Sequence, residues 1–345
     1  MRVKKEVICI LLMAMTMLLN ACSSDESGAQ TVTTGEEPVG KQVQLMTYAP
    51  YFTEKEAPRR APSGFTAYIP DKVTDVGIYM LESTTAPYEE KHLRYATKWF
   101  AYFNSDANTY YTVYGYMPKA EGMSSGLSDV TTGGATLTIN GIKPVTADDI
   151  CIITGVNDTD TGLKEGQFHW SMANANDNFY MYLLMDHLYA SVKFSLIVSE
   201  EYAQLRTIKL KTMTLSVNIA SVNAAVTLHN TEGTSPITSV TYTSTGDNCA
   251  AEIFNNAEGQ ALSSATPLNI IACFAPTLSN NLTLVSTYDV YDSKGNLIRA
   301  NCEATNKIPN LEASRGQRVQ LNMKVDPTYL YVMSDKDLDN LFTIE

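Results

Sequence analysis

The sequence lacks the features that mark several large classes of protein. Charged residues make up only 18% of the chain, its net charge is −12, and it contains no block of Lys or Arg. That balance argues against nucleic acids and anionic membrane surfaces as partners. No stretch carries a convincing 3.6-residue apolar period, so long helices are not expected. The apolar run at residues 7–19 is too short to span a bilayer, because it covers only about 20 Å at ~1.5 Å per residue.

Residues that bind metals or catalyse reactions are few and scattered. The cysteines show no C-x-x-C spacing, so they do not predict a zinc site. No pair of histidines has ligand spacing, and none is tied by the sequence to a nucleophile or a carboxylate. We interpret Asp148 and Asp149 as turn residues. The sequence therefore predicts no catalytic residue, no metal, no cofactor and no enzyme activity. The four histidines are His92, His169, His187 and His229.

The N-terminus is typical of an exported chain. Basic residues at positions 2, 4 and 5 precede the apolar run, and Asn20-Ala21 leads directly into Cys22. This order is similar to the bacterial lipobox, in which the signal peptide, here residues 1–21, is removed and the cysteine is acylated. The alternative is an ordinary secretory signal with a coincidental cysteine. Acyl chains such as palmitate on Cys22 would hold the chain at the outer membrane through ~0.8 kcal/mol per buried CH₂.

The segment that follows the lipobox is predicted to be a tether. Residues 22–40 are small, polar and acidic, with no apolar period, and this composition favours a flexible chain. The Ser-Ser-Asp-Glu run at 23–26 looks like the acidic signal that sends Bacteroidetes lipoproteins to the cell surface. We therefore expect a cell-surface location.

The first strand is predicted at residues 41–48, because Val43 and Leu45 alternate with polar residues. An exposed loop with three prolines follows at residues 49–64 and holds the dibasic pair Arg59-Arg60.

The rest of the chain is typical of an all-β protein. Short apolar runs separated by turn residues predict antiparallel sandwiches. Residues 180–198 alternate with period two, which predicts either one long half-buried strand or two strands joined by a bend. Residues 292–296 predict a hairpin turn, and the Gly/Ser-rich residues 122–134 predict a loop. We place an N-terminal sandwich at residues 41–172 and a C-terminal sandwich at residues 173–345.

Four cysteines remain in the predicted sandwiches. Cys273 and Cys302 both lie in strand-like runs and could pair in an oxidising compartment. Four unpaired, buried thiols, which would include Cys151 and Cys249, fit equally well.

Three blocks bring a family into view. They are a Trp followed by YYTVYGYMP ending at Pro118, LLMDHLYASVKFSLIV at residues 183–198, and RVQLNMKVDPTYLYV at residues 318–332. With the lipobox, the tether and the Arg-bearing loop, they resemble the fimbrillin-like proteins of Bacteroidetes, which are subunits and accessory proteins of fimbriae. The resemblance implies two tandem transthyretin-like β-sandwich domains.

The resemblance also implies an assembly route. An Arg-specific protease would cut after the first strand, at Arg59-Arg60 or Arg60-Ala61, and that strand would leave. A strand from the next subunit, from its residues 326–345, would replace it. The charge-rich residues 335–339 interrupt this tail, so an anchor, tip or minor subunit remains open. Its partners would be other fimbrial subunits, the protease and the membrane.

The sequence leaves one alternative function open. Its 20 tyrosines could stack on sugars, or they could pack the core and the sheet faces of a β-rich protein. We expect a structural or accessory component of surface fimbriae that serves adhesion. The alternative is a cell-surface glycan-binding lipoprotein.

Overall fold

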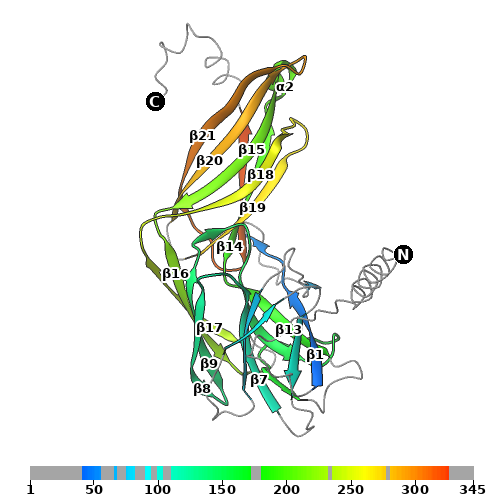
Figure 1. Cartoon of the computed structure of the whole chain (residues 1–345), viewed down its shortest axis with the longest axis vertical. Coiled ribbons are helices and arrows are strands. Elements are labelled where there is room, and N and C mark those ends of the chain that lie inside the picture. The colour runs from blue at the N-terminus through cyan, green and yellow to red at the C-terminus, as the bar shows by residue number, and fades with distance from the viewer. Residues whose placement is uncertain are drawn as a thin grey trace, which may run out of the picture.

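A computed structural model describes residues 41–55, 66–67, 75–81, 90–94, 99–103, 110–171, 180–231, 235–276 and 280–325. Strands dominate these ranges, and the helix among them is α2 (Glu200–Leu205), which is six residues long. Figure 1 shows several sheets arranged as two sandwich-like bodies along the long axis of the molecule. The prediction of an all-β fold is confirmed.

The first body encloses one hydrophobic cluster between two sheets. The larger sheet has the order β3-β1-β13-β11-β7-β4-β5, with β12 beside β7 and β6 beside β1. The smaller sheet has the order β17-β16-β9-β8. Side chains from both sheets, such as Val43 and Leu137, meet in this cluster, which we call the first cluster. The strands of the larger sheet are β1 (Lys41–Ala49), β3 (Thr66–Ala67), β4 (Asp75–Leu81), β5 (Glu90–Arg94), β6 (Trp99–Phe103), β7 (Tyr110–Lys119), β11 (Cys151–Asn157), β12 (His169–Ser171) and β13 (Tyr180–His187). Those of the smaller sheet are β8 (Ser124–Thr131), β9 (Gly134–Ile142), β16 (Ser221–His229) and β17 (Ile237–Thr245).

The second body is built in the same way. Its two sheets have the orders β10-β19-β14-β22-β2 and β18-β15-β20-β21. Phe194 and Leu215 belong to the cluster between them, which we call the second cluster. The strands of the first of these sheets are β2 (Thr53–Glu54), β10 (Val145–Thr146), β14 (Ala190–Val198), β19 (Leu268–Phe274) and β22 (Gln317–Val325). The others are β15 (Arg206–Val217), β18 (Cys249–Ala261), β20 (Asn280–Asp292) and β21 (Leu297–Leu311).

The chain passes back and forth between the two bodies. Strands β16 and β17 lie late in the sequence but supply Val222 and Val226 to the first cluster. Strands β2 and β10 lie early but belong to the second body. The predicted boundary at residues 172 and 173 therefore does not coincide with the division between the two clusters.

The alternating run at residues 180–198 forms two strands joined by a bend. β13 ends at His187 and β14 begins at Ala190, and the two strands belong to different sheets. The prediction that this run is half-buried was wrong. Odd-numbered residues such as Met181 and Leu183 are as buried as their even-numbered neighbours. These strands are covered on both faces.

Of two other local predictions, one is confirmed and one is wrong. The hairpin turn is confirmed, because Asp292 N–H donates to the Asn296 carbonyl at 2.9 Å and Gly295 adopts φ +84°. The loop predicted at residues 122–134 is wrong over most of its length, because β8 occupies residues 124–131. Within the described ranges, no helix has the length and apolar character needed to cross a bilayer.

Candidate functional site

The first strand, β1, is paired along both edges. It runs parallel to β13, with Gln44 opposite Tyr180 and Tyr48 opposite Leu184. Its other edge pairs antiparallel with β6 over residues 41–45 and with β3 at Tyr48 and Ala49. The first strand of the chain is therefore an interior strand of the larger sheet.

One face of β1 is built into the first cluster. Val43 and Leu45 are 0% and 4% exposed, and Ala49 is also buried. The polar residues Gln42 and Gln44 lie on the opposite face, as the alternation predicts. Burying a valine or leucine side chain stabilises a fold by about 1.5–3 kcal/mol. Removing β1 would therefore open an apolar groove beside β13.

The segment after β1 crosses to the second body. Thr53 and Glu54 form β2, which runs parallel to the start of β22. Thr53 N–H donates to the Gly316 carbonyl at 2.9 Å, and Lys55 N–H donates to the Arg318 carbonyl at 2.8 Å. Residues 41–55 thus form one continuous segment that contributes a strand to a sheet of each body.

His187 fastens this segment at the crossing point. Its Nε2 lies 2.8 Å from the Pro50 carbonyl oxygen. The Phe52 ring stacks on the imidazole, with centroids 3.8 Å apart and planes inclined by 20°. The Arg318 guanidinium also lies over the Phe52 ring, 5.2 Å from its centroid. The last residue of β13 therefore holds the chain where it leaves β1.

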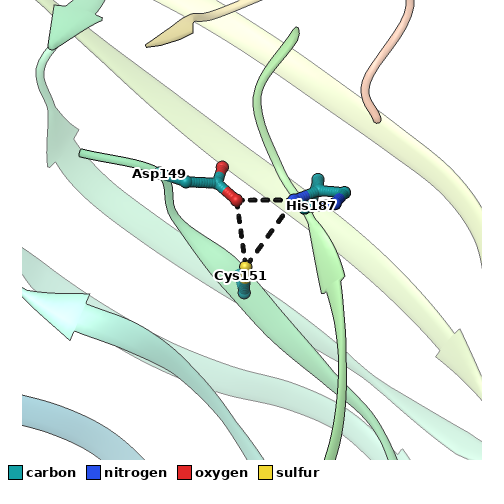
Figure 2. A group of neighbouring side chains, drawn as sticks. All are labelled: Asp149, Cys151 and His187. Carbon is teal, nitrogen blue, oxygen red and sulfur yellow. Dashed lines mark hydrogen bonds and ion pairs between the residues drawn. The ribbon is translucent and has the colours of Figure 1, made fainter. Parts of the chain in front are cut away.

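His187 also belongs to a buried polar cluster with Asp149 and Cys151 (Figure 2). Asp149 Oδ2 is 2.5 Å from His187 Nδ1 and accepts a hydrogen bond from Cys151 Sγ at 3.1 Å. Cys151 Sγ and His187 Nδ1 are 3.9 Å apart. The expectation that no histidine is tied to a carboxylate was wrong, and Asp149 is more than a turn residue.

The sheet register explains why sequence reasoning missed this cluster. Cys151 and His187 lie directly opposite each other in the antiparallel pair β11–β13, although 36 residues separate them. No local spacing encodes this juxtaposition. The signal available in the sequence was the D-x-C spacing of Asp149 and Cys151, which indicates nothing without the facing histidine.

Burial and charge shift the ionisation of the cluster. Burial lowers the pKa of His187, but its hydrogen bond to Asp149 and the nearby negative charge outweigh burial, so the pKa is raised above its ordinary value. Both ring nitrogens face acceptors, which favours the doubly protonated ring. Burial, reinforced by Asp149, also raises the pKa of the Cys151 thiol well above its ordinary value, so this thiol is neutral.

A second ion pair, between Arg315 and Asp186, lies next to His187. Arg315 Nη1 lies 2.5 Å from Asp186 Oδ2 and donates to the His187 carbonyl at 3.2 Å. The adjacent Gly316 N–H donates to the Tyr189 carbonyl at 2.8 Å. The turn before β22 is therefore attached to the bend between β13 and β14.

The cluster of Asp149, Cys151 and His187 is placed to hold the N-terminal segment rather than to meet a substrate. Cys151 is 0% exposed and His187 is 4% exposed, so a dissolved substrate does not reach them. All four cysteines among the described residues are free thiols, and the pairing of Cys273 with Cys302 is not formed. What the geometry provides is a fastened N-terminal segment.

Two predicted sites lie outside the described residues. They are the lipidation residue Cys22 and the processing pair Arg59-Arg60. The Arg pair falls within residues 56–65, directly after the fastened segment ends at Lys55. Lipidation and processing at these residues remain predictions.

Comparisons with known proteins find a distant likeness. No protein-family model and no curated protein matches the chain. A crystal structure of a candidate cell adhesion protein from Bacteroides ovatus aligns with a TM-score of 0.40 and 11% identity, over 84% of this chain and 93% of the other. A fimbrial protein from Bacteroides vulgatus aligns with a TM-score of 0.36 and 12% identity, over 82% and 95%. A candidate polysaccharide-binding protein from Bacteroides thetaiotaomicron aligns with a TM-score of 0.31 and 8% identity, over 82% and 90%.

Proposed function

We propose that the chain is a lipid-anchored subunit or accessory component of bacterial surface fimbriae and serves adhesion. The observation that carries this proposal is the placement of residues 41–55. They form an interior strand of one sheet and an edge strand of another, and the segment that joins them to the rest of the fold holds Arg59-Arg60. The lipobox at Cys22 and the polar tether support export to the cell surface.

Proteolysis would convert this placement into an assembly step. After a cut at Arg59-Arg60 or Arg60-Ala61, only noncovalent contacts hold β1 against β13 and β2 against β22. Departure of the segment leaves unpaired N–H and C=O groups along β13 and at the start of β22, beside an apolar groove. Such an edge favours addition of another strand.

The geometry specifies what the replacement strand must do. It must run parallel to β13, as β1 does, and then cross to β22. It must place small or apolar side chains where Val43, Leu45 and Ala49 are buried. We propose that residues 326–345 of another copy, or of a related subunit, supply this strand, and that the charged residues 335–339 limit how far it inserts.

Limited digestion of the folded mature chain with an Arg-specific protease tests the proposal. We expect one early cut after Arg59 or Arg60, loss of the N-terminal fragment, and high-mass species that resist SDS. The double variant Arg59→Ala, Arg60→Ala should resist the cut and stay monomeric. Arg299→Lys, which alters an arginine in β21, away from the segment, should still be cut and assemble.

The remaining outcomes separate the alternatives. A clean cut with release of β1 but no polymers supports an anchor or tip component, whose own tail does not donate. Resistance of residues 56–65 to the protease contradicts the strand-exchange mechanism. If the uncut monomer also binds a glycan array, the glycan-binding alternative takes its place.

A further inference from the structure

The buried polar cluster of Asp149, Cys151 and His187 brings together three kinds of metal ligand. Asp149 supplies a carboxylate, Cys151 a sulfur and His187 an imidazole nitrogen, and their ligand atoms all lie within 4.8 Å of one another. In the part of the chain that the structure describes, they are the group of three such residues that meets this distance. Sulfur, imidazole and carboxylate together favour zinc over calcium or magnesium, which prefer oxygen ligands.

We propose that Asp149, Cys151 and His187 form a zinc-binding site at the crossing between the two bodies. The ligand atoms are Cys151 Sγ, His187 Nδ1 and both carboxylate oxygens of Asp149. Together they supply four donor atoms, the coordination number that zinc takes in structural sites, in a shell distorted from a regular tetrahedron because two of the donors belong to one carboxylate. The site does not depend on fimbrial assembly, so a test of zinc binding is independent of the proposed function.

An unsatisfied oxygen points to the bound ion. Asp149 Oδ1 is buried and has no hydrogen-bond partner, and the side chain is only 10% exposed. A buried carboxylate oxygen without a partner is costly, because it has lost water and gained nothing in return. A cation held by both carboxylate oxygens would satisfy it.

The surroundings of His187 match those of a metal ligand. Its Nε2 faces the Pro50 carbonyl at 2.8 Å, and Phe52 packs flat against the ring. A histidine that binds a metal through one nitrogen usually donates its other N–H to such a carbonyl, which fixes the ring orientation. Here that contact leaves Nδ1 directed at Asp149 and Cys151.

The distances require only a small adjustment. Zinc with ordinary bond lengths and near-tetrahedral angles places ligand atoms of different residues about 3.3–3.6 Å apart. The separations of Sγ from Nδ1 and from Oδ2, 3.9 and 3.1 Å, lie near this range, while Nδ1 and Oδ2 must move apart from 2.5 Å. Cys151 and His187 are fixed in paired strands, but Asp149 lies in the loop between β10 and β11 and can shift.

Zinc would change how the segment after β1 is held. In the hydrogen-bonded form, the neutral Cys151 thiol donates to Asp149. On binding, the thiol proton and the proton between Nδ1 and Oδ2 pass to solvent, and the ion takes their place. Since Nε2 keeps its contact with Pro50, the ion would join the β10–β11 loop, β13 and the departing chain through one rigid centre.

The test measures zinc in the mature chain, residues 22–345, refolded with the metal and without a polyhistidine tag. Every sample carries Cys22→Ser, so that the lipid-attachment thiol does not compete. After exchange into zinc-free buffer, we expect about one zinc per chain. Cys151→Ser and His187→Gln should each weaken binding by more than about 100-fold. The matched control Cys249→Ser alters a half-buried thiol outside the cluster and should keep the ion.

Cobalt provides a spectroscopic readout of the same site with all of its ligands intact. Cobalt bound to the otherwise unaltered chain should give the visible bands of a tetrahedral centre and a near-ultraviolet thiolate-to-cobalt band. Cys151→Ser should lose the thiolate band. The proposal is overturned if the chain retains no zinc and shows no thiolate band. Equal zinc binding by Cys151→Ser and Cys249→Ser would also overturn it and leave a hydrogen-bonded cluster only.

Discussion

The first and the last described strands, β1 and β22, are both paired in parallel with a strand from the middle of the chain, but they differ in burial. β1 runs parallel to β13, and β22 runs parallel to β14, so two consecutive strands each take a parallel partner from a distant part of the chain. β1 alternates between fully buried and half-buried residues after its first two positions. After three half-buried residues, β22 alternates between exposed and half-buried residues, and it has no fully buried one.

Their edges differ as well. β1 is flanked on both sides, by β13 and by β6 and β3. In the described ranges, β22 pairs with β14 along residues 318–325, while its other edge is covered only by β2 at Gln317 and Arg318. The strand that the proposed mechanism removes is thus the better-buried one. The contrast teaches that release of residues 41–55 must be driven by a replacement of similar burial.

Truncating a buried side chain of β1 should have the largest effect on stability. Leu45→Ala should lower the free energy of unfolding by about 2–5 kcal/mol, because it leaves a cavity in the first cluster. Leu321→Ala in β22 should cost about 1–2 kcal/mol, because that side chain is only partly buried. Urea unfolding of both variants measures the difference. Equal losses would show that β22 is as deeply integrated as β1.

Removing the Phe52 ring, which contacts His187 of β13 and Arg318 of β22, should have the next largest effect. We call this ring the aromatic link. Phe52→Ala deletes the stack on His187 and the contact with Arg318, which together contribute about 1–2 kcal/mol. We expect faster cleavage by the Arg-specific protease in residues 56–65, because the preceding segment is held less firmly. Phe52→Tyr keeps the ring and is the matched control. Unchanged cleavage in Phe52→Ala would mean that the backbone contacts alone fasten the segment.

Detaching β2 from β22 should cost less. Thr53→Pro removes the N–H that donates to the Gly316 carbonyl, a loss of about 1 kcal/mol. Thr53→Val keeps this N–H and serves as the control. Trypsin cleavage after Lys55 should accelerate in the proline variant alone. If the valine variant is cut as fast, the threonine hydroxyl rather than β-pairing holds the segment.

The sequence predicted the parts of this comparison that depend on local pattern. The alternation of Val43 and Leu45 with glutamines predicted β1, and the turn residues at 292–296 predicted a hairpin. Strand β8 was missed because Gly and Ser have low strand propensity. It lies at a sheet edge with no fully buried residue, so pairing with β9 rather than side-chain burial defines it.

The candidate site depended on nonlocal order. Asp149, Cys151 and His187 meet only because β11 and β13 pair in one register, which no short pattern encodes. The return of β16 and β17 to the first cluster is likewise a tertiary choice, since their alternating residues would suit either body.

The smallest expected effect lies beside the aromatic link. Tyr51 is 69% exposed, although its neighbours Pro50 and Phe52 both contact His187. Tyr51→Ala should change the free energy of unfolding by less than about 0.5 kcal/mol and leave cleavage in residues 56–65 unchanged. Urea unfolding and the digestion assay measure both. A large loss from Tyr51→Ala would mean that the exposed side of the segment also helps to fasten it, so that the contacts with His187 are not sufficient. A neutral result for Tyr51→Ala together with faster cleavage of Phe52→Ala would assign the fastening to the Phe52 side chain, which contacts His187 and Arg318.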